Sequence, residues 1–303
     1  MSSPLVARRA PRHKAAMTED TAPRQLFSPQ RRRMAMARGQ RLAARHGGAF
    51  LAEHMADEVV ERLGWVNRSF ADVLVIGHAP ALLTDALAAR GAKITLAGPV
   101  ARDVACDEDA LPFSPGTFDL VVALGTLDSV NDLPGALIQI NRSLRPDGLM
   151  MAALIGAGSL PRLKAAMLAA DEAGGRGVAA RIHPQIDVRA AGDLMQRARF
   201  AMPVADSDSL TVRYSALPAL VRDLRCHGWT NTLASSPPPL TKNALIAALQ
   251  SFHEAADDDG KTAERFEIVY LSGWAPSPDQ PKPARRGSAT ASLAGVLGKA
   301  KKG

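Results

Sequence analysis

The sequence contains few cysteines, few aromatic residues and no long apolar run. Its 303 residues include two cysteines, Cys106 and Cys226, and only 4% aromatic residues. Two distant cysteines exclude a disulfide framework and a cysteine-based metal site, so we expect a reducing, cytoplasmic setting. No apolar run approaches the ~20 residues that cross a bilayer. We predict no secretory signal, because the sequence near the N-terminus lacks the apolar segment that such signals contain. We therefore expect a globular protein without a transmembrane segment.

The positive charge is concentrated at the two ends of the chain. Residues 1–46 carry eleven Lys or Arg against two acids, and residues 277–303 carry six against one. We predict disordered basic ends over 1–25 and 277–303, because such charged tails rarely bury enough apolar surface to fold. Aromatic residues, on which single-stranded nucleic acids stack, do not accompany the charge. The sequence therefore does not favour nucleic acid as a partner.

The central part alternates short apolar runs with helical segments, which is typical of a doubly wound, mostly parallel α/β sheet. Two predicted helices lie in the N-terminal segment 26–70, ahead of a main domain over 71–276. A final antiparallel hairpin, formed by 209–214 and 265–274, encloses a helical cap at about 215–264. The predicted parallel strands lie at 73–76, 94–97, 104–106, 118–124 and 149–155.

Several segments resemble known proteins. The stretch from 109 to 154, DALPFSPGTFDLVVALGTLDSVNDLPGALIQINRSLRPDGLMMAAL, is similar to class I S-adenosylmethionine-dependent methyltransferases. The segments VNDLPGAL, DSDSLTVRY, RDLRCHGWTN and FEIVYLSGWAP resemble, more narrowly, bacterial relatives of mitochondrial complex I assembly factor 5, an arginine hydroxylase. The resemblance implies a seven-stranded sheet, S-adenosylmethionine as cofactor, and a protein substrate or respiratory complex subunit as partner.

The resemblance also implies which residues line the cofactor cleft, at the carboxyl edge of the sheet. They are Gly77, His78, Ala79, Gly98, Asp107, Glu108, Leu124 and Gly125. The chain departs from the family pattern in four places. Val75 replaces an acid of the first strand, Ala79 and Ala81 replace glycines of the turn, and Gly98 replaces the acid that accepts the ribose hydroxyls. After the fourth strand, Asp128 and Ser129 stand where aromatic residues or histidine often follow.

No catalytic residue and no metal site can be identified from the sequence. The seven histidines include no pair spaced four residues apart as in helical zinc sites, and no Ser/His/Asp or Cys/His nucleophile pattern is present. Two functions stay open. One is a cofactor-dependent enzyme, a methyltransferase or a hydroxylase of the same fold, that acts on a protein. The other is a non-enzymatic assembly protein on a decayed methyltransferase fold.

Overall fold

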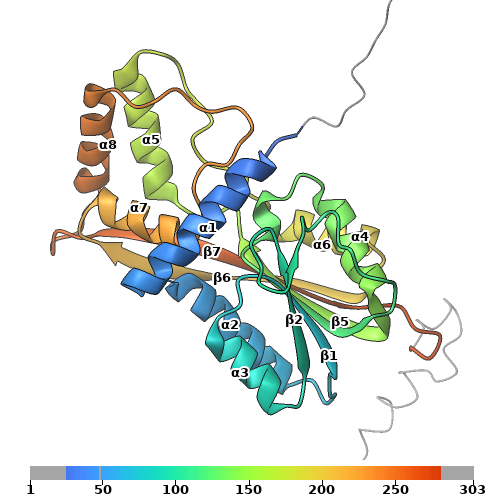
Figure 1. Ribbon diagram of the computed structural model, residues 1–303. Coiled ribbons are helices and arrows are strands. Elements are labelled where there is room, and N and C mark those ends of the chain that lie inside the picture. Colours follow the sequence, from blue (N-terminus) through green and yellow to red (C-terminus); the bar gives the residue numbers. More distant parts are fainter. Residues whose placement is uncertain (1–24, 48, 281–303) are drawn as a thin grey trace, which may run out of the picture.

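The computed structural model describes residues 25–47 and 49–280 (Figure 1). The predictions of disorder for 1–25 and 277–303 fall mostly outside this part, so they stay predictions. Two helices, α1 (Pro29–His46) and α2 (Phe50–Gly64), precede the first strand as the sequence predicts. Ser28 caps α1 by accepting a hydrogen bond from the Arg31 N–H, and Gly47 ends the helix in a left-handed conformation.

A seven-stranded mixed sheet forms the centre of the molecule, as expected. Its order is β3-β2-β1-β4-β5-β7-β6, with β7 antiparallel to both of its neighbours and β1 to β5 parallel. The strands are β1 (Asp72–Gly77), β2 (Lys93–Gly98), β3 (Val104–Ala105), β4 (Phe118–Leu124), β5 (Leu144–Ile155), β6 (Ala201–Tyr214) and β7 (Thr262–Trp274). The central strands β1 and β4 are almost entirely buried, which explains their continuous apolar runs.

Helices cover both faces of the sheet (Figure 1). Alternate strand residues separate into two cores: Val73 and Val75 face one layer, and Leu74 and Ile76 face the other. The first layer holds α2 and α3 (Ala81–Ala89) and, further along the sheet, α5 (Pro161–Gly174), α7 (Leu217–Cys226) and α8 (Lys242–Glu254). The second layer holds α4 (Leu133–Ser143) and α6 (Val188–Arg197).

The hairpin is longer than the sequence predicts. Strand β6 begins at Ala201 rather than at residue 209 and pairs with β7 as far as Tyr214, opposite Thr262. The polar run Asp206–Ser207–Asp208 belongs to this strand: it pairs with β7, and Ser207 and Asp208 are exposed on the edge strand. The two strands enclose α7 and α8, and α8 lies beside α5 (Figure 1). No helix in the described part is both long and apolar enough to cross a membrane.

Candidate cofactor cleft and substrate cavity

The turn after β1 is held close to the end of β4. Gly77 has a φ of 87°, and a Cβ there would lie 2.5 Å from the Leu124 carbonyl oxygen. The His78 N–H donates a hydrogen bond to that same oxygen, at 3.0 Å. Glycine is therefore required at 77 by the approach of two strand ends, because any side chain would collide with backbone. The structure thus brings Gly77, His78 and Leu124 together, and half-buried Ala79 follows in the same turn.

Gly98, at the end of β2, lies beside this turn. Its φ of 138° belongs to a region that L side chains rarely adopt, and a Cβ would lie 3.4 Å from the Gly77 nitrogen. An acid at 98 would therefore be strained unless the backbone changed. The end of β2 offers no side chain to accept the hydroxyls of a ribose.

The acidic segment after β3 is divided between the surface and the interior. Asp107 is partly exposed and lies 3.4 Å from Arg33. Glu108 is fully buried, and its two oxygens accept hydrogen bonds from Arg32 of α1 at 2.9 and 3.0 Å. The Thr126 hydroxyl donates to the same carboxylate. Both Glu108 oxygens are thus engaged within the protein, while Asp107 faces a separate cavity of about 420 Å³ that Asn131 and Asp132 also line.

Two aromatic rings lie against the backbone just after β4. A Cβ on Gly125 would lie 2.9 Å from Cζ2 of Trp229 and 3.0 Å from Cδ2 of His78. The Trp229 indole N–H donates to the Gly125 carbonyl oxygen at 3.1 Å. The opposite face of the indole stacks on His227, with ring centroids 4.8 Å apart. The family resemblance implies that Leu124 and Gly125 lie against the cofactor at this place.

Trp229 belongs to a segment that α1 holds in place. We call residues 227–234 the strap. Arg31 donates to the carbonyl oxygens of Leu233 and Asn231, and Arg38 donates to the Thr230 hydroxyl. The backbone adds two hydrogen bonds, from Ser28 N–H to Thr232 and from Ala234 N–H to Leu26. The basic residues of α1 thus have structural partners in the strap.

Gly39 allows α1 to contact the strap closely. A Cβ at 39 would lie 2.6 Å from the Gly228 nitrogen and 2.9 Å from the Cys226 carbonyl oxygen. We expect Gly39→Ala to lower the free energy of unfolding by about 1–2 kcal/mol, although alanine favours helices, because backbone on both sides must move. Urea unfolding measures this change. Gly64→Ala, where the added methyl meets open space, is the matched control and should not destabilise the protein.

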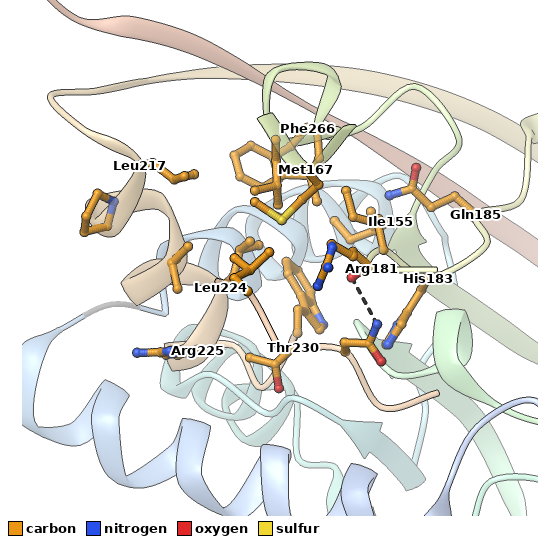
Figure 2. Close-up of a pocket in the computed structure, with 18 of the residues that line it drawn as sticks. Ile155, Met167, Arg181, His183, Gln185, Leu217, Leu224, Arg225, Thr230 and Phe266 are labelled. Carbon is orange, nitrogen blue, oxygen red and sulfur yellow. Dashed lines mark hydrogen bonds between the residues drawn. The ribbon is translucent and has the colours of Figure 1, made fainter. Parts of the chain in front are cut away.

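A cavity of about 490 Å³ opens beyond Trp229, between the sheet and the helices α5, α7 and α8 (Figure 2). Its walls are largely apolar and include Ile155 of β5, Phe266 of β7, Met167 of α5 and Leu224 of α7. Its polar and charged residues lie on the loops after β4 and α5, near the end of α7 and on the strap: Asp128, Arg181, His183, Gln185, Arg225, Thr230 and Asn231. This size and lining are typical of sites for small ligands or inserted side chains.

Asp128 is the acidic residue among those that line the cavity. Its Oδ1 is buried and has no hydrogen-bond partner among the described residues. Burial raises the pKa of Asp128 to about 6, while the nearby Arg32 opposes this shift. Arg181 is already paired with buried Asp171 at 2.7 Å. Burial also lowers the pKa of His183 to about 4, so at pH 7 it is neutral. At neutral pH, Asp128 is therefore mostly charged, with Arg32 nearby and no hydrogen bond to its Oδ1.

The fold and this sheet edge agree with comparisons against known proteins. Residues 48–202 match the family model described as "Methyltransferase domain". The zebrafish protein named "Arginine-hydroxylase NDUFAF5, mitochondrial" is 34% identical over 249 residues, which cover 82% of this chain and 72% of that protein. This chain belongs to the class I S-adenosylmethionine-dependent methyltransferase family, in its NDUFAF5-like branch.

Other relatives of this NDUFAF5-like chain match over a smaller share of their length. The human arginine-hydroxylase NDUFAF5 is 36% identical over 65% of this chain and 57% of its own length. A malonyl-[acyl-carrier protein] O-methyltransferase of Gallionella capsiferriformans is 31% identical over 58% of each chain. The relatives thus have different named activities, and the activity of this chain depends on its own site residues.

The site residues of this NDUFAF5-like chain do not fit the family's cofactor as they stand. His78 and Trp229 lie against Gly125, where the family resemblance implies the cofactor, Gly98 offers no side chain to its ribose, and Glu108 is engaged by Arg32. Asp107 is partly exposed, but its carboxylate already lies 3.4 Å from Arg33. Within residues 25–47 and 49–280, no three or more metal-ligating side chains gather at one place.

Sequence reasoning missed the side chains that decide the character of this site. Trp229 and His227 lie in the RDLRCHGWTN segment, which supported the family resemblance but gave no spatial link to Gly125. The sequence shows Asp128 as a departure from the family pattern, but it does not show that this carboxylate lines a cavity. One signal was available in the sequence: the turn lacks glycines at 79 and 81, and a loop carries Trp229. A large ring can fill space that a ligand no longer occupies.

Proposed function

We propose that this chain binds an arginine-bearing segment of a protein partner during assembly of a respiratory complex. The observation that carries the proposal is the 490 Å³ cavity lined by Asp128, an acid whose Oδ1 has no hydrogen-bond partner among the described residues. Relatives at 34–36% identity are named arginine-hydroxylases, which supports arginine as the group recognised. A cytoplasmic location is part of the proposal, because Cys106 and Cys226 are free thiols.

The cavity has the chemistry that an arginine side chain needs. Apolar walls such as Ile155 and Leu224 would cover the methylene stem, and the guanidinium would pair with Asp128. The Trp229 indole, which also lines the cavity, offers a surface on which a guanidinium stacks. Exposed apolar residues of α8, Leu245 and Leu249, lie at the cavity and would contact the flanking residues of the segment.

Peptide binding tests the proposal. Fluorescence anisotropy would compare short peptides in which one central arginine, flanked by leucines, is replaced by citrulline, which has the same shape without the charge. We expect the arginine peptide to bind at least ~10-fold more tightly at pH 8, because a charge-assisted bond with a buried carboxylate contributes ~1.5–3 kcal/mol. The preference should decline below about pH 6, where Asp128 takes up a proton.

The control uses an acid that lies away from the cavity. Asp128→Asn should abolish the preference for arginine over citrulline. Asp85→Asn, on an exposed position of α3, should leave it unchanged. Equal binding of both peptides to the unaltered protein would contradict the proposal.

A second candidate function is methyl transfer from S-adenosylmethionine to a protein. It is favoured by the family and by Asp107, which lines a cavity of about 420 Å³ on the adenine side. The rings of Trp229 and His78 oppose it, since they would have to leave before the cofactor entered. Direct titration with the cofactor, described below, separates the two candidates.

A further inference from the structure

The rings at Gly125 pack closely against one another and against backbone; His227 is buried, and His78, Trp229 and Phe50 are half-buried. Trp229 contacts Gly125 through a hydrogen bond of 3.1 Å and through close approach of its ring. His78 meets the indole edge-on, with ring centroids 6.1 Å apart. His227 stacks on the indole, lies 6.3 Å from His78 between ring centroids, and meets Phe50 of α2 at 5.5 Å. Four rings from three distant segments thus form one cluster around a strand end.

The cluster needs its histidines uncharged. Burial, together with His227, lowers the pKa of His78 to about 4, and burial also lowers the pKa of His227. His227 accepts from the Leu51 N–H through Nε2 at 3.1 Å, and its Nδ1 lies 2.8 Å from the Asp223 carbonyl oxygen. The tautomer with hydrogen on Nδ1 satisfies both contacts. The cluster is therefore a neutral aromatic core at pH 7.

The outer side of the cluster is covered by the strap and α1. The strap is held by the arginines of α1 and by backbone bonds near Thr232, and Gly39 leaves no room for it to shift toward the helix. Moving Trp229 outward would break its bond to Gly125 and its stacking on His227 and would expose apolar ring surface. Trp229 is therefore held by several contacts, unlike a side chain that only covers an open cleft.

We propose that Trp229 and His78 are a built-in replacement for the methionine part of the cofactor, so that this chain excludes S-adenosylmethionine. The rings take the space in which the family holds its ligand, and they satisfy the backbone there as a ligand would. The absence of glycines at 79 and 81 and of an acid at 98 then follows from the exclusion of the cofactor, because no ligand constrains these positions. The inference concerns the cofactor cleft and does not depend on the arginine cavity.

Isothermal titration with S-adenosylmethionine and S-adenosylhomocysteine tests this proposal on the full chain. We expect no detectable binding to the unaltered protein at millimolar ligand. Trp229→Ala combined with His78→Ala opens the space, and we expect binding at least ~10-fold tighter than any seen for the unaltered chain. Trp229→Phe keeps a ring in place and should resemble the unaltered chain. Trp65→Ala removes a tryptophan that is 75% exposed and is the matched control.

The results are read together with a check of folding by circular dichroism. Micromolar binding by the unaltered protein overturns the proposal, because the rings would then not exclude the cofactor. A folded double variant that binds no better than the unaltered chain also overturns it, since the rings would not be the cause of exclusion. If the double variant does not fold, Trp229→Leu provides the same comparison with less loss of packing. Peptide binding is measured separately, so a result that overturns the exclusion of the cofactor does not decide whether the cavity binds arginine.

Discussion

Replacing Arg32 with methionine is expected to lower the free energy of unfolding by about 3–5 kcal/mol. Arg32 is 5% exposed and gives two hydrogen bonds to Glu108, which is fully buried. Removing the guanidinium would leave a buried carboxylate without its counter-charge, which is the costly way to break such a pair. The same change would release α1 from the sheet edge, because Arg32 also donates to the Ser129 hydroxyl and the Thr126 carbonyl oxygen.

Urea unfolding at pH 7 measures this effect. Arg41→Met, at an exposed position of the same helix, is the control and should change stability by less than about 0.5 kcal/mol. The double variant Arg32→Met with Glu108→Gln should be more stable than Arg32→Met alone, because the remaining side chain is neutral. If the double variant were as unstable as the single one, the cost would come from packing and not from the buried charge.

The second large effect is expected for Asp128→Asn, which should stabilise the protein while weakening arginine binding. Burial raises the pKa of Asp128 in the folded protein to about 6, above the ordinary 3.8. Above pH 6 the folded state must keep this carboxylate charged at a cost, and the unfolded state does not. We expect about 2 kcal/mol of added stability for Asp128→Asn at pH 8, after allowing for partial solvent contact.

The pH dependence gives the sign of the effect. As the pH falls through 6 toward 4, the folded carboxyl takes up a proton and the cost disappears, so the difference between the variant and the unaltered protein should vanish near pH 4. Unfolding curves at pH 4, 6 and 8 measure it, with Asp85→Asn as the exposed control. If Asp128 instead served mainly as a partner of Arg32, Asp128→Asn would destabilise the protein at pH 8.

The fold was largely predictable, because buried strands leave a clear pattern. The apolar runs of β1 and β4 and the alternation with helices predict a parallel sheet, and the carboxyl ends of its strands meet at one edge. Gly77, His78 and Leu124 were therefore expected to lie together, and they do. The start of β6 was missed because its polar residues match an exposed edge strand as well as a loop.

The contents of the cleft were not predictable in the same way. Trp229 and Gly125 are more than a hundred residues apart, and no periodicity or short motif links them. The pairing of Arg32 with Glu108 spans 76 positions and connects a helix ahead of the sheet with a loop inside it. A basic helix predicted only a charged surface, because the sequence does not say which of its arginines face inward.

The sequence by itself determined the sheet, the order of its elements, the family, and the absence of the glycines and the acid on which cofactor binding depends. These features follow from local patterns, since strands and turns are encoded within a few residues. The tertiary structure alone decided that Trp229 and His78 fill the vacated place, and that Asp128 is buried beside an apolar cavity. Such facts depend on which side chains meet when distant segments pack, and burial then sets their charges.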